Sequence, residues 1–401
     1  MTNLWIVNHY AGLPDTTPAT RTFDLGRQLV RMGHHVTVFA CSFNHYSFTE
    51  ERLKWYQLVA RAEIEGVRFV WIRGVHYRKN DVWRLLNMLV FALLALVVGS
   101  RLKPRPDIVI GVTVHPLAPV SAFFISRLRG ARFWLDITDI WPQSLIELGH
   151  LRADSLSAKA IAWLERFSLR KAKVVISVLP GIADYVRDQG LPDKPTAWVP
   201  NGIDAQRAPT LDLCEPSDGP TFTLTWAGGF APAHALDTIL EAAAILQAKP
   251  EPRIRFTLIG DGPQLERVKK RVGELGLTNV ELTGFVPKAQ LYQRLAQADG
   301  FLVTGRNLPV YRYGISYNKV FDYMLAGRPI IFAVNARNNP VAEAGAGLSV
   351  PAENAPALAQ AILQLRDLPR SARQEMGQLA RQFVLSQFDY SVIAARLAGL
   401  F

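Results

Sequence analysis

Short apolar runs and segments of helical period alternate along the first half of the chain. β-Branched runs at residues 4–7 and 36–40 flank a Gly/Pro/Thr-rich loop, 11–20, and a helical segment, 23–32. Further apolar runs at 107–111, 132–136 and 173–177 are separated by helical segments. Because strands that alternate with helices form right-handed βαβ units, residues 1–200 predict one doubly wound α/β domain with a parallel sheet.

The alternation stops and then restarts. Residues 200–220 are rich in Pro, Gly and acids and contain no periodic run, so we expect a linker there. From residue 221 to 334 strands and helices alternate again, and residues 355–401 are helical, ending in an amphipathic segment. Two open α/β domains leave a cleft at the carboxyl ends of their strands, where ligands bind.

Composition and charge narrow the class of protein. The 401 residues are 49% hydrophobic and 20% charged, which excludes a disordered tail or a coiled coil. Two cysteines, Cys41 and Cys214, are too few for a disulfide framework and fit a reducing cytosol. The net charge is +11, and residues 1–200, with 25 basic and 16 acidic side chains, contribute +9 of it. Basic motifs interleaved with aromatics are absent, so we expect no nucleic-acid partner.

The most apolar stretch, residues 88–99, lies inside the most basic segment. The 16 residues between Arg84 and Arg101 would form about 24 Å of helix, which is short against a hydrocarbon core of about 30 Å. Two interpretations remain open: a helix buried in the first domain, or one that lies in a membrane interface and attracts anionic headgroups. Because the first residues lack a basic n-region and a small-residue cleavage site, we expect no secretion signal there.

Three glycine-containing turns follow predicted strands in the second half, at residues 227–230, 260–263 and 284–287. Glycine lets the backbone approach a ligand, and N–H groups at the next helix start can hold an anion. None of the three fits G-x-G-x-x-G or the P-loop pattern, which counts against a dinucleotide oxidoreductase or a P-loop NTPase.

The segment 313–329 carries the most chemical information. Ser316 is a candidate N-cap, which would place Asn318 and Lys319 in the first helical turn. The helix dipole disfavours a lysine there unless a bound phosphate shares that end of the helix. Lys319 and Asp322 share a face and could engage the phosphate and ribose of one nucleotide, or form an ordinary surface ion pair.

The order of these motifs resembles the retaining, nucleotide-sugar-dependent glycosyltransferases of family four. The resemblance is strongest to bacterial polysaccharide and O-antigen enzymes that transfer N-acetylated amino or deoxyamino sugars. It rests on residues 31–38, 136–142, 199–204, 228–237, 259–263, 279–287 and 313–329. It implies the GT-B fold: two Rossmann-like doubly wound domains facing a cleft. Residues 1–200 would form the acceptor-side domain and 201–387 the nucleotide-sugar domain, while the C-terminal helix, 388–401, returns to the first domain.

The resemblance also implies roles for residues of the second domain. Asp322 stands where the family's second Glu binds the ribose hydroxyls, and the first Glu of that pair falls at Gly314, which has no side chain. The donor sugar would then meet the backbone N–H groups of Ile315 and Ser316. Phe285 to Pro287 would pack on the base. The expected donor-binding residues are Gly228, Gly229, Phe285, Val286, Pro287, Ile315, Ser316, Asn318, Lys319 and Asp322.

The family's positive charges are partly missing. Gly229 and His234 occupy the positions near which many relatives carry Arg and Lys. Lys319 would therefore have to neutralise the diphosphate, with Arg306, Arg312 or Arg21 as further candidates.

Candidate groups of the first domain follow its strands. Asp136 and Asp139 are candidate general-base partners, although their spacing equally suits an Asp N-cap. His115 is a second catalytic candidate, although a lone histidine is more often structural. Thr20 and Arg21 could meet acceptor phosphates, or Arg21 could simply solvate the helix start. Without an Asp-x-Asp, a His pair at i, i+4 or a Cys pair, we expect no metal and no cofactor.

The resemblance implies transfer with retention, in which the departing nucleoside diphosphate helps to deprotonate the incoming hydroxyl. We expect a UDP-sugar donor, a polyprenyl-diphosphate-linked saccharide acceptor, and a role in O-antigen, lipopolysaccharide or other surface polysaccharide synthesis. The expected location is cytoplasmic, peripheral on the inner face of the membrane with its anionic surface. Two alternatives stay open: a GT-B nucleotide-sugar epimerase and a non-catalytic sugar-nucleotide-binding subunit.

Overall fold

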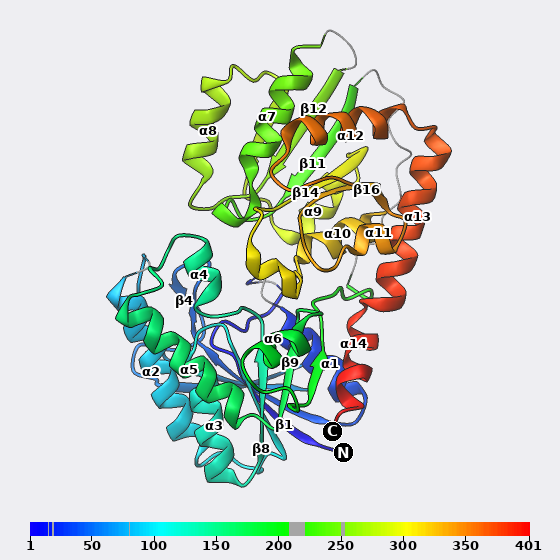
Figure 1. The fold of residues 1–401 in the computed structure, drawn as a ribbon. Coiled ribbons are helices and arrows are strands. Elements are labelled where there is room, and N and C mark those ends of the chain that lie inside the picture. The colour runs from blue at the N-terminus through cyan, green and yellow to red at the C-terminus, as the bar shows by residue number, and fades with distance from the viewer. Residues whose placement is uncertain (15, 18–19, 80, 208–220, 250–252) are drawn as a thin grey trace. The chain divides into compact units, whose positions relative to one another are not determined.

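The computed structural model describes the chain except for residues 15, 18–19, 80, 208–220 and 250–252 (Figure 1). Two compact units account for the described residues. Unit 1 comprises Met1–Asn201 with Tyr390–Phe401, and unit 2 comprises Gly202–Asp389. These boundaries lie one and two residues from the expected ones at 200 and 388. The expected linker, 200–220, falls largely outside the described residues.

Unit 1 is built on a twisted sheet. Within the described residues its strand order is β10-β9-β8-β7-β1-β2-β6-β5, and every pair is parallel except the edge pair β5 and β6. The strands are β1 (Asn3–Val7), β2 (His35–Cys41), β5 (Val59–Ile64), β6 (Val67–Ile72), β7 (Ile108–Val112), β8 (Arg132–Ile137), β9 (Val174–Ser177) and β10 (Thr196–Trp198), with a small separate pair, β3 (Phe43–Asn44) and β4 (Thr49–Glu50). The sequence pattern predicts β1, β2, β7, β8 and β9 but neither β10 nor the β5–β6 hairpin.

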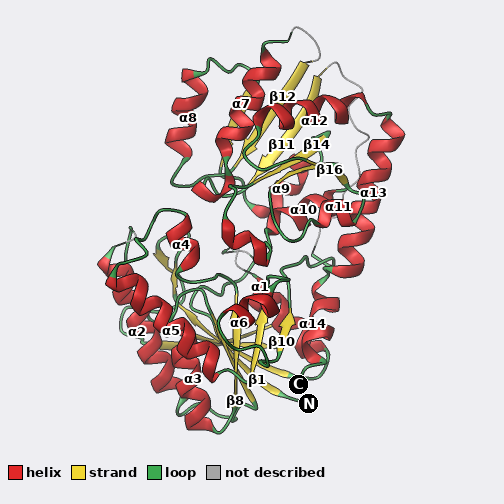
Figure 2. Cartoon of the chain, in the orientation of Figure 1, coloured by secondary structure: helices red, strands yellow, loops and turns green. Residues whose placement is uncertain are grey.

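Helices cover both faces of this sheet (Figure 2). They are α1 (Arg21–Arg31), α2 (Val82–Gly99), α3 (Leu117–Arg129), α4 (Gln143–Glu147), α5 (Leu156–Lys171), α6 (Ile182–Asp188) and α14 (Tyr390–Ala398). Alternate strand residues such as Leu4 and Ile6 form a core with α1 and α14, so the C-terminal helix belongs to unit 1 as expected. Gly111 of β7 faces the other side, where an added Cβ would touch Pro119 of α3.

The apolar stretch near residue 90 forms α2, but only 28% of this helix is buried. Its Asp81 N-cap accepts a hydrogen bond from the backbone N–H of Trp83. By length and composition alone α2 could cross a membrane. One side of α2 is buried in unit 1 and the other side is exposed, so the expected burial in the first domain holds for part of the helix.

Unit 2 repeats the architecture with a smaller sheet. Its described strands follow the order β13-β12-β11-β14-β15-β16 and are all parallel. They are β11 (Thr221–Ala227), β12 (Arg253–Ile259), β13 (Val280–Gly284), β14 (Gly300–Thr304), β15 (Ile330–Ala333) and β16 (Gly347–Ser349). The helices are α7 (Leu236–Gln247), α8 (Leu265–Glu274), α9 (Lys288–Leu295), α10 (Asn318–Ala326), α11 (Pro340–Glu343), α12 (Ala355–Asp367) and α13 (Arg370–Gln387), with 3₁₀ turns η1 (Pro232–His234) and η2 (Pro309–Tyr313).

In each sheet, successive strands are added first on one side of the first strand and then on its other side. Unit 1 adds β2 on one side of β1 and later β7 on the other, and unit 2 does the same with β12 and β14 around β11. Such switch points leave a crevice at the carboxyl ends of the strands, where open α/β sheets bind ligands. Ligand-binding residues are therefore expected directly after β1, β7 and β11.

Candidate functional site

Glycine turns at the carboxyl ends of β11 and β12 pack backbone against backbone. The N–H of Gly228 donates to the carbonyl of Ile259 at 2.9 Å. Gly260 has φ of 139°, and an added Cβ there would lie 1.9 Å from the carbonyl oxygen of Gly228. Only glycine permits this approach, which keeps the end of β11 clear of side chains.

Lys319 points into this turn from the first turn of α10. Its Nζ lies 3.9 Å from the ring centroid of Trp226, and a Cβ added to Gly228 would stand 2.9 Å from it. The ammonium is buried and has no hydrogen-bond partner among the described residues. Burial lowers its pKa well below the usual value. The alternative of a surface ion pair with Asp322 is therefore wrong.

His234 lies on the other side of the same space. Its ring packs edge-on against Trp226 and Tyr317, at centroid distances of 5.6 and 5.3 Å, and its buried Nδ1 has no partner among the described residues. Burial and the charge of Lys319 lower the pKa of His234 to about 2, so the imidazole is neutral. A buried cation without a partner is unfavourable, and an anion at the Gly228 turn would remove that penalty. The arrangement is suited to a phosphate group.

Asp322 is held one turn further along α10. It is half-buried and accepts a hydrogen bond from the Tyr292 hydroxyl of α9 at 2.7 Å. Burial and the Asp322 charge raise the pKa of Tyr292, which keeps the hydroxyl a donor. The sequence gives no signal for Tyr292, because its pairing with α10 depends on how the two crossover helices pack.

The loop before α10 departs from two predictions. Tyr317 occupies the N-cap position and makes no side-chain cap bond, so Ser316 is not the cap. The N–H of Ile315 donates to Oδ1 of Asn338 at 2.9 Å, and this bond leaves it unable to serve the donor sugar as expected. Gly314 has φ of 104°, a conformation that L side chains rarely adopt, which accounts physically for the missing Glu.

Of the expected phosphate-binding cations in unit 2, Lys319 is the one at the Gly228 turn. Arg306 faces Glu353, with Nε 3.8 Å from the carboxylate, and Arg312 lies over the ring of Tyr313. Asn318 is exposed beside Lys319 at the helix start. Contact of Lys319 and Asn318 with a bound phosphate stays a prediction.

The segment after β13 presents an aromatic ring to solvent. Phe285 is 74% exposed, Val286 is half-buried and Pro287 is exposed. The N–H of Gly260 donates to the carbonyl of Gly284, which fixes the start of this segment beside the glycine turns. Base packing by residues 285–287 and a ligand contact by Gly229 remain predictions.

In unit 1 the switch point brings two histidines together. Nε2 of His115, after β7, lies 2.9 Å from Nδ1 of His9, after β1, and both rings are buried. Burial and the nearby Arg84 lower the pKa of His115 to about 3. His115 is therefore not a lone histidine, and it is a weak base near neutral pH. His9 is not among the residues predicted from the sequence, although its position two residues beyond the end of β1 was an available signal.

The two aspartates after β8 have different environments. Asp136 forms an ion pair with Arg21 at 2.5 Å, and Arg21 also donates to the carbonyl of Val199. Asp139 is an exposed residue, but protein atoms around its carboxyl desolvate the charged form and raise its pKa to about 6. The N-cap interpretation is wrong, because α4 begins after Pro142.

Two acceptor-side predictions concern the start of α1. Thr20 is buried at the N-cap of α1 and makes no side-chain cap bond there. The guanidinium of Arg21 is committed to Asp136 and Val199, so its role as a solvating group of the helix start does not hold. Contact of either residue with an acceptor phosphate stays a prediction.

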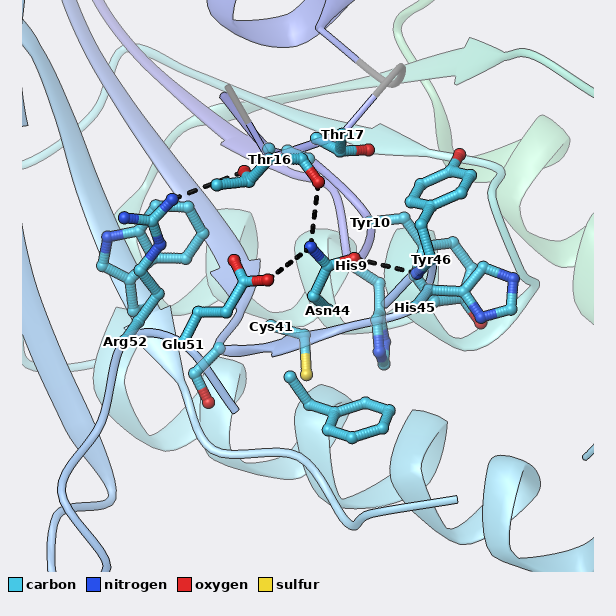
Figure 3. A pocket seen from close by; sticks show the side chains of 15 residues that line it. His9, Tyr10, Thr16, Thr17, Cys41, Asn44, His45, Tyr46, Glu51 and Arg52 are labelled. Atoms are coloured by element: carbon cyan, nitrogen blue, oxygen red, sulfur yellow. Dashed lines mark hydrogen bonds between the residues drawn. The ribbon is translucent and has the colours of Figure 1, made fainter. Parts of the chain in front are cut away.

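A small pocket of about 30 Å³ opens at the carboxyl ends of β1 and β2 (Figure 3). Aromatic rings form one side: Tyr10 and His45 stack at 4.9 Å, with Tyr46 beside them. Asn44 lies between these rings and Glu51, and its amide donates to the carbonyl of Thr16 and to Glu51 (Figure 3). Aromatic faces next to amide and carboxylate groups suit a polar ligand with apolar faces. In the described part of the chain, no group of three His, Cys, Asp or Glu side chains is placed to hold a metal.

Comparison with known proteins gives each unit a counterpart. Residues 16–202 match the family "Glycosyl transferase 4-like domain", and residues 221–367 match "Glycosyl transferases group 1". The chain is similar to the alpha-D-kanosaminyltransferase of Streptomyces kanamyceticus, at 25% identity over 60% of this chain and 62% of the relative. It is also similar to the lipopolysaccharide core biosynthesis glycosyltransferase LpsD of Rhizobium meliloti, at 25% identity over 57% of this chain and 63% of that one. Each of these two matches spans less than two thirds of the relative's length.

Among solved structures, the chain resembles Anabaena HepE in complex with UDP-glucose. The TM-score is 0.67 at 15% identity, and the match covers 100% of this chain and 99% of the other.

Proposed function

We propose that the chain transfers a sugar from a UDP-sugar to a lipid-linked saccharide. It belongs to the glycosyltransferases that join a glycosyl transferase 4-like domain to a group 1 domain in the GT-B fold. The observation that supports a nucleotide-sugar donor is the buried ammonium of Lys319 at the Gly228 turn, which has no hydrogen-bond partner among the described residues. A nucleoside diphosphate supplies the anion that this ammonium and the neutral His234 lack. Asp322, oriented by Tyr292, accepts hydrogen bonds from the ribose hydroxyls.

The proposed reaction retains configuration at the anomeric carbon. The bond between that carbon and the β-phosphate oxygen breaks, and the acceptor oxygen bonds to the same face. The acceptor proton passes to an oxygen of the departing UDP. Lys319 and the N-terminus of α10 stabilise the negative charge that develops on the diphosphate, so the proposal needs no metal and no cofactor.

Relatives support the proposed substrates. One similar protein is named for transfer of kanosamine, another for lipopolysaccharide core synthesis, and HepE is seen with UDP-glucose. In line with the resemblance to transferases of amino sugars, we propose an N-acetylated hexosamine or deoxyhexosamine as the donor sugar. The proposed acceptor is a polyprenyl-diphosphate-linked saccharide of bacterial surface polysaccharide or O-antigen synthesis. Its diphosphate would approach Thr20 and Arg21, and Asp139, with its raised pKa, would position the hydroxyl.

The proposed location is the cytoplasmic side of the membrane, with the protein attached peripherally. A polyprenyl acceptor is anchored in that membrane, and unit 1 exposes the apolar side of α2.

The test is transfer from a panel of UDP-sugars to a polyprenyl-diphosphate saccharide, followed by NMR of the new anomeric bond. We expect transfer with retention, at least 100-fold slower in Lys319→Ala and in Asp322→Ala while both variants stay folded. An isomerised donor in reactions without acceptor would favour an epimerase instead. Tight UDP binding without transfer to any acceptor would indicate a non-catalytic binding subunit, which the missing Glu at Gly314 keeps as the second candidate.

A further inference from the structure

The outer side of α2 is an apolar surface that the described residues of the domain do not cover. Its exposed side chains are more than one third accessible and run along the whole helix: Val82, Trp83, Leu85, Leu86, Leu89, Leu93 and Val97. A soluble monomer rarely exposes so many neighbouring large apolar groups without a partner. A partner for this side of α2 is therefore to be expected.

The inner side of α2 fixes the helix to unit 1. Asn87, Phe91 and Ala95 are buried, and the Asn87 amide donates to the carbonyl of Val75 at 2.6 Å. At the other end Arg129 of α3 donates to the carbonyls of Ser100 and Leu102. Because withdrawal of α2 would break these contacts, the helix lies on the domain and does not cross a bilayer as a separate span.

Two further helices extend the apolar surface. In Figure 1, α2, α3 and α5 lie side by side on one face of the unit 1 sheet. Phe124 and Leu128 of α3 and Trp163 of α5 are exposed, and Phe167 stacks on both Phe124 and Trp163. We call the exposed apolar side chains of these three helices the apolar face. It ends in aromatic rings that suit the boundary between lipid and water.

Basic side chains border the apolar face. The three helices each lead into a parallel strand, so their C-terminal ends lie at the same edge of the sheet. The exposed cations at this edge are Arg101, Lys103 and Arg105 after α2, Arg127 of α3, and Arg170 and Lys171 of α5. Long cationic side chains beside an apolar surface hold headgroup phosphates while their stems remain in the interface. A second copy of this chain would instead bring the same positive border against itself.

We propose that the apolar face is a docking surface for an anionic phospholipid bilayer, with the outer side of α2 immersed at the depth of the headgroups and first acyl carbons. The docking rests on the proposed function only in that it would bring unit 1 to a lipid-linked acceptor.

α2 also connects the docking surface to the candidate site of unit 1. Arg84, on its inner side, donates to the hydroxyl of Tyr10 at 3.3 Å, and Phe91 packs on His9 at 4.3 Å. Tyr10 and His9 line the pocket at the ends of β1 and β2. One helix therefore touches both the bilayer and the wall of the pocket, which places that wall within a helix diameter of the lipid.

The experiment is flotation of the full chain with vesicles of phosphatidylcholine alone or with 30% phosphatidylglycerol. We expect binding to the anionic vesicles, reduced about tenfold or more in Leu89→Glu/Leu93→Glu because two exposed side chains no longer enter the lipid. Arg101→Gln/Lys103→Gln/Arg105→Gln should reduce it by a factor on the order of 100. The matched control is Ile245→Glu/Leu379→Glu, two apolar residues of unit 2 that are each 38% exposed, and it should bind like the wild type.

Two further measurements separate the outcomes. A thermal shift with UDP should be the same in the wild type and in all three variants, which shows that they are folded and that donor binding does not depend on docking. Brominated lipids should quench the wild type more than Trp83→Phe/Trp163→Phe. Equal flotation of the wild type and Leu89→Glu/Leu93→Glu would overturn the proposal. So would a wild-type dimer in sedimentation velocity that this variant dissociates, without vesicle binding, because the apolar face would then be an interface between copies.

Discussion

Replacement of Lys319 by methionine should lower nucleotide affinity and raise the stability of the ligand-free protein at once. Methionine keeps the apolar stem that lies on Trp226 and removes the buried ammonium. Loss of one partner of a buried charge pair costs about 3 kcal/mol, which is a factor on the order of 100 in the dissociation constant for UDP. Without ligand the ammonium has no hydrogen bond, so its removal should raise the free energy of unfolding by about 1 to 3 kcal/mol.

The sign of the pH dependence follows from the same lysine. Burial places its folded pKa below the unfolded value of 10.5, so unfolding takes up a proton between the two values. The stability of the ligand-free wild type should therefore rise with pH across this window, whereas Lys319→Met should lack that rise. Calorimetric titration with UDP and chemical unfolding between pH 6 and 10 measure the two effects.

The control is Lys269→Met on α8, where the lysine is exposed and pairs with Glu266. This variant should leave the affinity for UDP and the pH dependence of the free energy of unfolding unchanged. If Lys319→Met bound UDP as tightly as the wild type, or if it were less stable without ligand, the inference that this ammonium awaits an anion would be refuted.

Three other predictions concern single groups. Gly260→Ala should lose about 2 kcal/mol of stability in urea unfolding, because its Cβ would meet the Gly228 carbonyl oxygen at 1.9 Å, and an unchanged midpoint would contradict the packing of the two turns. Tyr292→Phe should raise the KM for the donor about fivefold with little change in kcat, since Asp322 loses an orienting bond of about 1 kcal/mol; an unchanged KM would argue against a ribose contact. Burial raises the pKa of Glu165 from 4.5 to about 7, so the folded carboxyl retains a proton that the unfolded one releases and stability falls as pH rises between these values. Glu165→Gln should flatten that fall, by up to about 3 kcal/mol, and parallel thermal profiles from pH 4.5 to 7.5 would disprove it.

The regular part of the fold could be predicted because buried parallel strands are apolar runs bounded by turns. The runs at residues 4–7 and 107–111 fall within or beside β1 and β7, and Asn318 and Lys319 lie in the first turn of α10 as expected. The β5–β6 hairpin escaped prediction, because β5 is a half-exposed edge strand with charged residues among its apolar ones.

The candidate site could be predicted in part. The sequence predicts Lys319 and the Gly228 turn near a phosphate, because the helix dipole disfavours a lysine at a helix start unless an anion binds there and glycine lets the backbone approach a ligand. Ser316 failed as a cap because the backbone turns one residue later, and Ile315 failed as a donor because Asn338, 23 positions away in the chain, takes its N–H. Such a partner has no local signal.

The sequence by itself determined two α/β units, their glycine turns and the basic, apolar segment near residue 90, because these depend on neighbours within one or two elements. Only the tertiary structure decided which groups are left without partners. It buried Lys319 against Trp226, joined His115 to His9 across the switch point, and left large apolar side chains along one side of α2 exposed. The physical reason is that burial and pairing are set by residues distant in the chain, which no local pattern records.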